Sequence, residues 1–184
     1  VFDGGSFVLN PGGALAVQLP LFEDTVAHID LLRGPEGWRA EDGPKARIPD
    51  MLEQDYHAMV LGVRDYLRKS GFAKVLLGLS GGIDSAIVAT IAADAISAEN
   101  VRCVMLPSDY TSESSLQDAK AVAENLGCAY DFVPITEGQA AITGTLAPLF
   151  VGTQPDLTEE NIQSRLRGLL LMALSNKLSL IHIS

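Results

Sequence analysis

A short segment rich in serine and glycine carries the residues whose chemistry is easiest to interpret. It has the sequence Ser80-Gly81-Gly82-Ile83-Asp84-Ser85. The two glycines let the backbone turn sharply and leave their amide N–H groups unobstructed. Those amides, the hydroxyls of Ser80 and Ser85, and the N-terminus of a following helix would together form a cradle for a phosphate-like anion. The alternative is a tight turn in which Asp84 only favours the positive end of a helix.

The position of this segment between a strand-like run and a helical run supports the anion cradle. Residues 74–79 are a short apolar run typical of a buried strand, and residues 85–97 predict a helix that is apolar on nearly every face. In a parallel sheet, ligands bind at the carboxyl ends of the strands. A Walker A loop is excluded because no lysine follows the glycines, and the segment lacks the Gly-x-Gly-x-x-Gly of a dinucleotide loop.

The elements that must position this loop follow an alternating order from residue 50 onward. Helical spacing of apolar residues predicts helices at 51–70, 85–97, 116–126 and 157–176, and apolar runs predict strands at 74–79, 101–106 and 129–135. Ser114 and Gln117 have the spacing of a capping box at the start of the third helix, and Gly127 is its expected stop. The order predicts an α/β fold, a parallel sheet with helices on both faces.

The region before residue 50 has a different character. Two runs, 6–9 and 14–19, flank a turn sequence and predict a hairpin, and residues 26–31 are a candidate third strand. Such a β-rich piece is too small to bury its own core, so we expect it to be the end of a larger domain. Residues 33–49 contain three glycines and three prolines without apolar periodicity, which predicts a linker or a surface crossing.

The composition of the 184-residue chain excludes several classes of protein. It is 47% hydrophobic and 20% charged, which is typical of a folded soluble domain, and no apolar run reaches the roughly 18 residues of a membrane span. No signal peptide is recognisable. A net charge of −10 argues against nucleic acid as a partner. Cys103 and Cys128 lie in strand-like runs, which predicts buried, reduced thiols of a cytoplasmic protein.

The complete hexapeptide, placed between a strand and a helix, resembles the loop of the ATP-pyrophosphatase superfamily, whose fold is the adenine nucleotide α-hydrolase-like fold. In that superfamily the loop holds the β- and γ-phosphates of ATP, which leave together as pyrophosphate. The resemblance implies ATP as co-substrate and Mg²⁺ as cofactor, with Asp84 as a metal ligand because a hard cation favours carboxylate oxygen. It implies ATP or pyrophosphate contacts for Gly78, Ser80, Gly81, Gly82, Asp84 and Ser85.

Within that superfamily, two later segments resemble the NAD⁺ synthetases. Residues 103–112 look like their second strand and the loop after it, although Asp109 stands where a variable or basic residue is expected. Residues 158–168 are similar to their deamido-NAD⁺-binding segment, which implies binding roles for Asn161 and Arg165. These two residues are four apart and therefore share one helical face. The alternative is that the arginines of this segment are simply solvated.

The N-terminal residues resemble a domain found only in the glutamine-dependent members of that family. Residues 1–8 and Gln18-Leu19-Pro20 look like the end of their nitrilase-type glutaminase domain. The resemblance thus implies a glutaminase remnant at 1–32, a linker at 33–49 and the N-terminal part of a synthetase domain at 50–177. The tail at 178–184 does not resemble the family, so we expect a truncated or chimeric chain.

The resemblance implies ATP-dependent amidation of deamido-NAD⁺ to NAD⁺ through an acyl-adenylate, with glutamine as the ammonia donor. The implied partners are ATP, deamido-NAD⁺ and glutamine or ammonia, with a homo-oligomer for the full-length enzyme. A nitrilase-type glutaminase works through Glu, Lys and a nucleophilic Cys, but no cysteine precedes Cys103. No catalytic residue is therefore identified, and we expect the isolated chain to be inactive.

Two other interpretations stay open at this point. The loop also occurs in tRNA-thiolating enzymes and GMP synthetases, so the chain could belong to another ATP-pyrophosphatase. The acidic net charge and the deamido-NAD⁺-like helix argue against a tRNA-binding enzyme. The second alternative is a fragment that binds a nucleotide without any catalysis.

Overall fold

The computed structural model describes residues 3–154 and 156–183, and the chain divides into two compact units at residues 62 and 63. The first unit holds strands β1 (Phe7–Leu9), β2 (Leu15–Gln18), β3 (Leu31–Gly34) and β4 (Gly37–Ala40) and the start of helix α1 (Met51–Ser70). The second holds the end of α1, strands β5 (Val75–Gly78), β6 (Val101–Met105), β7 (Ala129–Phe132) and β8 (Ile181–His182), and the remaining helices. Those are α2 (Ile83–Ile96), α3 (Glu113–Leu126), α4 (Thr136–Leu146) and α5 (Leu157–Leu178), with 3₁₀ turns η1 (Ala98–Asn100) and η2 (Ala147–Leu149).

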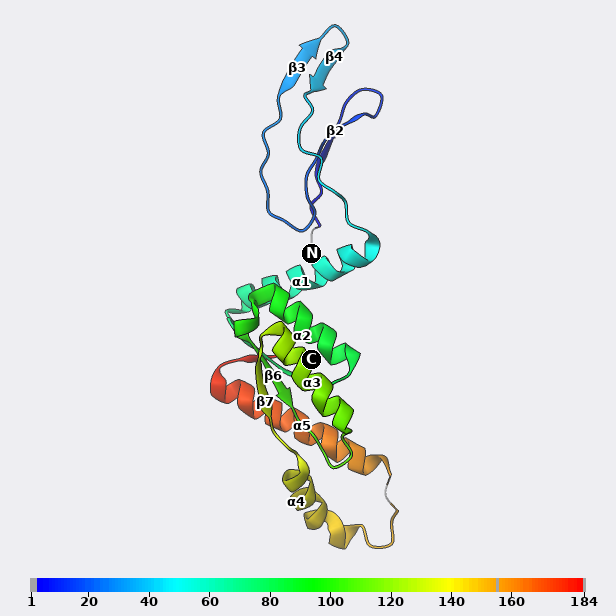
Figure 1. Ribbon diagram of the computed structural model, residues 1–184, viewed down its shortest axis with the longest axis vertical. Helices are drawn as coiled ribbons and strands as arrows, with labels where there is room; N and C mark the ends of the chain where they lie inside the picture. The colour runs from blue at the N-terminus through cyan, green and yellow to red at the C-terminus, as the bar shows by residue number, and fades with distance from the viewer. Residues whose placement is uncertain (1–2, 155, 184) are drawn as a thin grey trace. The chain divides into compact units, whose positions relative to one another are not determined.

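The first unit consists of two antiparallel hairpins, β1–β2 and β3–β4 (Figure 1). The first hairpin confirms the prediction. The third strand predicted at 26–31 is wrong, because β3 begins only at Leu31. Part of the predicted linker is instead strand β4. The sequence of β3, Leu31-Leu32-Arg33-Gly34, lacks the alternation of apolar and polar residues by which a strand is recognised. All four of its residues are exposed, so no buried face imposes such an alternation.

A small apolar core and one side-chain amide stabilise this unit. Ala16, Val17 and Ala40 are buried together. The side chain of Asn10 accepts a hydrogen bond from the Ala40 N–H at 2.8 Å and donates one to the Ala40 carbonyl at 2.9 Å. Asn10 thereby replaces a missing strand partner for the end of β4, which explains why a hairpin with exposed side chains is held in place.

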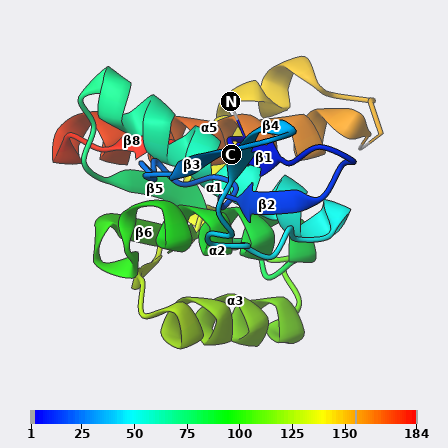
Figure 2. The same cartoon turned by 90° about the horizontal axis from the view of Figure 1, so that it is seen from above.

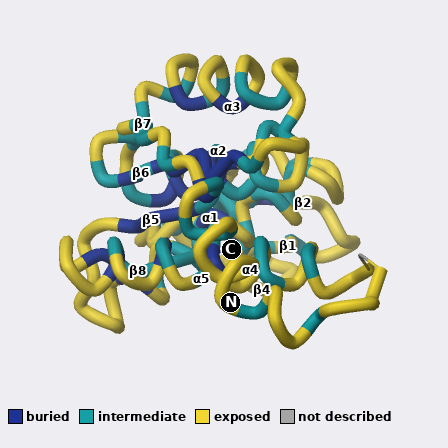
Figure 3. The backbone as a smooth tube through the Cα atoms, turned by 90° about the horizontal axis from the view of Figure 1, so that it is seen from below, coloured by how far each residue is buried: buried dark blue, intermediate teal, exposed yellow. Residues whose placement is uncertain are grey.

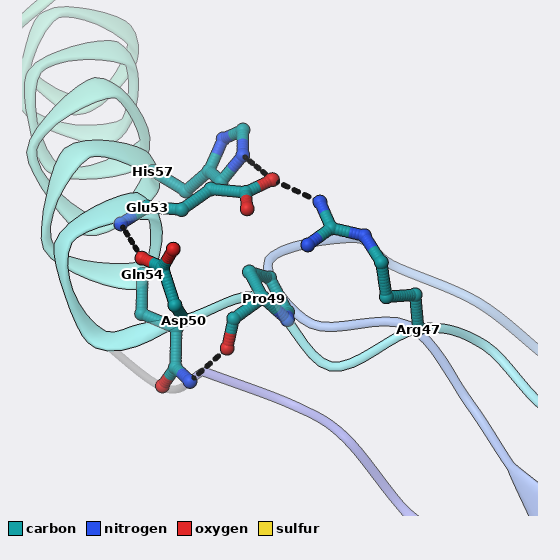
Figure 4. Close-up of polar contacts among 6 residues, drawn as sticks. All are labelled: Arg47, Pro49, Asp50, Glu53, Gln54 and His57. Carbon is teal, nitrogen blue, oxygen red and sulfur yellow. Dashed lines mark hydrogen bonds and ion pairs between the residues drawn. The ribbon is translucent and has the colours of Figure 1, made fainter.

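The end of the predicted linker is attached to the first turns of α1 (Figure 4). The Asp50 carboxylate accepts a hydrogen bond from the Glu53 N–H at 3.0 Å, as a helix-capping residue does. The Glu53 carboxylate pairs with the Arg47 guanidinium and lies 3.7 Å from His57 Nε2. The Arg47 contact lowers the pKa of the Glu53 carboxyl. The end of the predicted linker is therefore joined to α1 by side-chain contacts.

The second unit is an α/β fold built on one parallel sheet, which confirms the predicted fold class. The strand order is β7-β6-β5-β8, and each neighbouring pair is parallel. Figure 2 shows α5 on one side of β5 and β6, with α2 and α3 on the other. Alternate residues of β5 explain this layering: Val75 and Leu77 belong to the core with α2 and α3, whereas Leu76 belongs to the core with Leu166 and Leu171 of α5.

Burial is concentrated in the central elements (Figure 3). Leu76, Leu77 and Ala89 are fully buried, whereas most of α3 faces solvent on its outer side. Cys103 is buried and Cys128 half-buried, and both are free thiols. The predicted burial is thus confirmed in full for Cys103 and in part for Cys128. No helix in the described part of the chain has the length and apolar character to cross a membrane.

Several predicted boundaries shift in the second unit. The capping residue of α3 is Ser112, whose side chain accepts from the Ser115 N–H, so the predicted capping box at Ser114 is wrong. The stop at Gly127, in the left-handed conformation, is confirmed. Helix α4 was not predicted, because none of its residues is buried and its sequence carries no apolar face.

The tail forms the fourth strand of the sheet. Ile181 and His182 pair in parallel register with Val75 and Leu76 of β5. The connection from α5 is fixed by Ser175, whose buried hydroxyl donates to the Leu180 carbonyl at 2.7 Å. Residues 178–184, for which no family element was predicted, therefore supply a sheet strand through residues 181 and 182.

Candidate functional site

The Ser80–Ser85 loop connects the carboxyl end of β5 to the N-terminus of α2, as predicted. Its two serines face each other, with the hydroxyl oxygens 3.0 Å apart. The Ser85 hydroxyl accepts from the Ser80 N–H at 3.2 Å and can donate to the Gly82 carbonyl at 3.0 Å. The Gly82 N–H in turn donates to the Ser80 hydroxyl at 3.2 Å. Hydrogen bonds within the loop thus hold two hydroxyl groups in place at a helix N-terminus. Such an arrangement suits an anionic ligand.

Gly81 is the residue that allows this loop to exist. Its φ of +82° lies in the left-handed region that side chains disfavour. An added Cβ atom would also lie 2.3 Å from the carbonyl oxygen of Ser115, in the first turn of α3. Glycine is therefore required here both for its conformation and for the close approach of α3.

Asp84 lies in the first turn of α2 with its side chain exposed. Its carboxylate is a hard oxygen donor beside the loop, which fits one ligand position of a Mg²⁺ ion that also binds phosphates. Among the described residues, no group of three or more His, Cys, Asp or Glu side chains is placed to hold a metal ion alone. A single carboxylate such as that of Asp84 fits a Mg²⁺ ion only where other ligands, such as phosphate oxygens, complete its coordination.

A pocket of about 370 Å³ opens beside the loop at the carboxyl ends of β5 and β6. Its walls come from both strands, the loop and α5, and they are formed by Gly78, Leu79, Ser80, Val104, Met105, Leu106, Thr111, Arg167 and Leu171. The lining is mostly apolar with a few polar groups, as is typical of a site for a nucleoside-sized ligand. Of the predicted ATP residues, Gly78 and Ser80 line this pocket, and the others continue along the loop.

Among the described residues that line this pocket, Arg167 is the only charged one. Its Nε donates a hydrogen bond to the Leu106 carbonyl at 2.9 Å, which ties α5 to the end of β6. Burial lowers the pKa of its guanidinium. The sequence interpretation that both arginines of this segment are solvated is wrong for Arg167, which is half-buried.

A second pocket, of about 360 Å³, lies between α4 and α5. Asn161 and Arg165 both line it, which is consistent with their predicted common face. The remaining walls are Ile142, Thr158, Ile162, Leu166 and Leu169. Arg165 and Arg167 are two residues apart on one helix, so they project to opposite sides and face different pockets. The predicted dinucleotide residues therefore share one site, separate from the pocket beside the loop.

Asp109 follows β6 and is exposed. Its carboxylate accepts a hydrogen bond from the Thr136 hydroxyl at 3.2 Å, which links the loop after β6 to the start of α4. Asp109 is not among the residues that line either pocket.

Comparison with known proteins decides the family. The family model described as NAD synthase matches residues 55–184, which is more than half of the chain. The chain belongs to the NAD synthase family.

Two informative relatives in this family are named as glutamine-dependent enzymes. The chain is 62% identical over 177 residues to the glutamine-dependent NAD(+) synthetase of Rhodobacter capsulatus, covering 96% of this chain and 32% of that protein. It matches the structure of the glutamine-dependent NAD+ synthetase from Acinetobacter baumannii in complex with ADP, with a TM-score of 0.92 and 41% identity. That match covers 99% of this chain and 34% of the other. The chain thus spans about a third of the length of these relatives.

A more distant similarity is to an ammonia-dependent enzyme. The NH3-dependent NAD synthetase from Campylobacter jejuni, in complex with the nitrate ion, has a TM-score of 0.66 and 26% identity. It covers 74% of this chain, and this chain covers 57% of it. The NAD synthase match continues through residue 184 and so includes the tail that showed no resemblance by sequence inspection.

Sequence reasoning missed three residues of the site. Ser115 touches the loop only because the sheet brings the start of α3 against Gly81. Thr111 lines the pocket from the loop after β6 and accepts from the Ser108 N–H at 2.9 Å. Arg167 was visible as one of two arginines in the NAD synthase-like helix. Only the position of β6 shows which of the two enters the pocket beside the loop.

Proposed function

We propose that this chain provides the ATP-binding and dinucleotide-binding parts of an enzyme that amidates deamido-NAD⁺ to NAD⁺. The observation that carries the proposal is the pocket at the end of β5, where a preorganised Ser80–Ser85 loop meets a nucleoside-sized apolar cavity. The names of the relatives support the same reaction. Residues 1–32 would be the end of a glutaminase domain, 33–49 a connection, and 50–177 part of the synthetase domain, in a cytoplasmic homo-oligomer.

The proposed reaction has two steps. A carboxylate oxygen of deamido-NAD⁺ attacks the α-phosphorus of ATP, and the bond from that phosphorus to the β-phosphate oxygen breaks to release pyrophosphate. Ammonia, released from glutamine in the full-length enzyme, then attacks the acyl carbon and displaces AMP with loss of one proton. An ionised carboxylate needs no general base, so the chain's contribution is positioning and charge stabilisation.

The loop would hold the departing pyrophosphate. The Gly81 amide and the Ser80 and Ser85 hydroxyls lie at a helix N-terminus, where donors and the helix dipole favour negative charge. The Gly82 N–H would exchange its bond to the Ser80 hydroxyl for one to the pyrophosphate. Asp84 would share a Mg²⁺ ion with the phosphates, and the cation would supply neutralisation of the charge that develops on the leaving group.

The pocket between α4 and α5 would hold the dinucleotide. The Arg165 guanidinium can form a two-pronged contact with a phosphate or carboxylate, and Asn161 can donate and accept on the same face. Ile162 and Leu169 offer apolar contact to the rings. On this assignment, α5 contributes to both sites, and the carboxylate end of deamido-NAD⁺ must extend from its pocket to the α-phosphate for the first step.

Calorimetric titration of the 184-residue chain tests the proposal. We expect ATP with Mg²⁺ and deamido-NAD⁺ each to bind to separate sites, and Arg165→Gln to weaken only deamido-NAD⁺. Lys177→Gln, an exposed change in the same helix, is the matched control. Tight binding of tRNA with none of deamido-NAD⁺ would instead support a tRNA-thiolating enzyme.

The isolated chain is expected to bind ligands without turning them over. Its described residues contain no cysteine before Cys103, and Cys103 is a buried strand residue, so it offers no glutaminase nucleophile. An assay with glutamine, ATP, Mg²⁺ and deamido-NAD⁺ should give neither glutamate nor NAD⁺. Formation of NAD⁺ from glutamine by this chain alone would contradict that expectation.

A further inference from the structure

Arg167 carries a positive charge that no described carboxylate neutralises. The ion pairs of the described chain do not include it, and burial is the one cause of its lowered pKa, with no contribution from an acidic neighbour. A half-buried guanidinium without a counter-charge loses hydration that no ion pair offsets. Arg102, by contrast, pairs with Asp131 of the neighbouring strand.

The position of the Arg167 side chain is fixed by the protein itself. Its Nε donates to the Leu106 carbonyl at 2.9 Å, which holds the planar fork at the end of β6. Neither terminal nitrogen of Arg167 has an acceptor among the described residues, and neither is fully enclosed. The hydrogen bond to Leu106 therefore orients the guanidinium and leaves its two terminal nitrogens free to donate to a ligand.

The ligand that these nitrogens can reach is defined by the pocket they line. Arg167 shares its wall with Gly78 and Ser80, the residues where β5 enters the loop. Under the proposed function, the nucleoside of ATP lies in the pocket and its β- and γ-phosphates lie on the loop. The α-phosphate joins those two parts, so we expect it to lie along the wall that Ser80 and Arg167 both line.

We infer that Arg167 binds the α-phosphate of ATP through its terminal guanidinium nitrogens, an assignment that rests on the proposed function. The α-phosphate is the group at which the carboxylate attacks, and negative charge collects on its oxygens during the attack. A fixed guanidinium aimed at these oxygens stabilises that charge without having to reorganise. Arg167 would then be a catalytic residue of the first step, while Arg165 holds the other substrate.

The fork geometry makes arginine specific at this position. One nitrogen must reach the Leu106 carbonyl while two others reach phosphate oxygens. A lysine ammonium is a single point and cannot span both. Arg167→Lys should therefore restore charge but only part of the phosphate contact, whereas Arg167→Gln removes the charge.

The test compares three ligands that differ only in their phosphates: adenosine, AMP and ATP with Mg²⁺. Each is titrated into the wild-type 184-residue chain and into the Arg167→Gln, Arg167→Lys and Lys177→Gln variants. We expect Arg167→Gln to weaken AMP and ATP on the order of tenfold to a hundredfold, the worth of hydrogen bonds to a charged group. Adenosine affinity should stay unchanged, Arg167→Lys should be intermediate, and Lys177→Gln should match the wild type.

The alternatives give different patterns. If Arg167 only ties α5 to β6, Arg167→Gln weakens all three ligands equally and lowers the free energy of unfolding, which overturns the inference. Equal loss for adenosine and AMP at unchanged stability would place Arg167 against the base, which also overturns it. A wild-type chain that binds none of the ligands would refute the proposed ATP site itself, whereas unchanged AMP binding by Arg167→Gln would refute only the role of Arg167.

Discussion

The carbonyl oxygen of Ser115 lies 2.3 Å from the point that a Cβ atom on Gly81 would occupy. The ligand loop and the first turn of α3 are therefore built against each other. The Ser112 hydroxyl caps that turn by accepting from the Ser115 N–H, which keeps the Ser115 backbone in place. Since β5 and β6 feed these two segments, the shape of the loop depends on the packing of neighbouring βα units.

Replacement of Gly81 by alanine should therefore disrupt both the loop and the start of α3. A side chain at φ +82° is strained, and its Cβ would have to displace backbone atoms of Ser115. We expect a loss of about 1–3 kcal/mol in the free energy of unfolding, measured by urea denaturation, together with loss of ATP binding.

Gly168→Ala is the matched control for Gly81→Ala. Gly168 lies within α5 and has nothing within 4 Å of an added Cβ. Alanine there should leave stability unchanged or raise it by up to about 1 kcal/mol, since glycine is a poor helix former. Equal stability of the Gly81→Ala and Gly168→Ala variants would show that the predicted clash is relieved at no cost.

Asp84 should affect ATP binding only when a divalent cation is present. Asp84→Asn removes a hard oxygen ligand, so ATP affinity in Mg²⁺ should fall by about tenfold or more. In EDTA the same change removes a negative charge near the phosphates, so ATP affinity should be equal to or higher than that of the wild type. Calorimetric titrations of ATP in Mg²⁺ and in EDTA measure this difference in affinity between Asp84→Asn and the wild type.

Asp118→Asn, an exposed change on α3, serves as the control for Asp84→Asn. It should leave ATP affinity within error in both buffers. If Asp84→Asn weakened ATP equally in Mg²⁺ and in EDTA, the carboxylate would act on the loop conformation, and the proposed metal contact would be wrong.

The sequence predicted the central strand, the loop and the helix after it because their signals are local. An apolar run followed by glycine and serine specifies β5 and Ser80–Ser85 without reference to the rest of the chain. Where contacts are remote, the prediction failed. The hairpin of β3 and β4 depends on the Asn10 side chain, thirty residues from Ala40, and not on any apolar alternation.

The same distinction applies to the candidate site. Helical spacing placed Asn161 and Arg165 on one face, and both line one pocket. It could not reveal that Arg167, on the other side of α5, reaches the Leu106 carbonyl sixty-one residues earlier in the chain. Contacts between α5 and the sheet depend on how the helix packs against the strands. The periodicity of a single sequence does not indicate which strand end a helix will lie against.

Cys103 should make the protein less stable at alkaline pH. Burial raises the pKa of its thiol from 9.0 to about 12. Below pH 9 both folded and unfolded states hold the proton, so the full stability is present. Between pH 9 and 12 the unfolded chain loses the proton while the folded chain keeps it, so stability falls as pH rises, by at most about 1.4 kcal/mol at pH 10.

Cys103→Val isolates this effect, because valine fills a buried strand position without ionising. Urea denaturation at pH 7.5 and pH 10 should show a smaller loss of stability for Cys103→Val than for the wild type. Cys128→Val is the comparison variant: the Cys128 thiol contributes to the raised pKa of Cys103, but less than burial does, so its removal should change the pH dependence less than Cys103→Val. An identical pH dependence in all three proteins would rule out Cys103 as the source.

Ser175 should determine how firmly β8 joins the sheet. Its buried hydroxyl donates to the Leu180 carbonyl at 2.7 Å, and the N–H groups of Ile181 and Ile183 then donate to Lys74 and Leu76. Ser175→Ala leaves the buried Leu180 carbonyl without that donor, at an expected cost of about 1–3 kcal/mol in the free energy of unfolding. Hydrogen exchange at Ile181 and Ile183 should quicken in this variant, because β8 is anchored by α5 through this contact.

Ser164→Ala, a change at an exposed serine in the same helix, is the control and should alter neither the free energy of unfolding nor the exchange rates. If exchange at Ile183 stayed at the wild-type rate in Ser175→Ala, pairing with β5 alone would be sufficient to hold the strand.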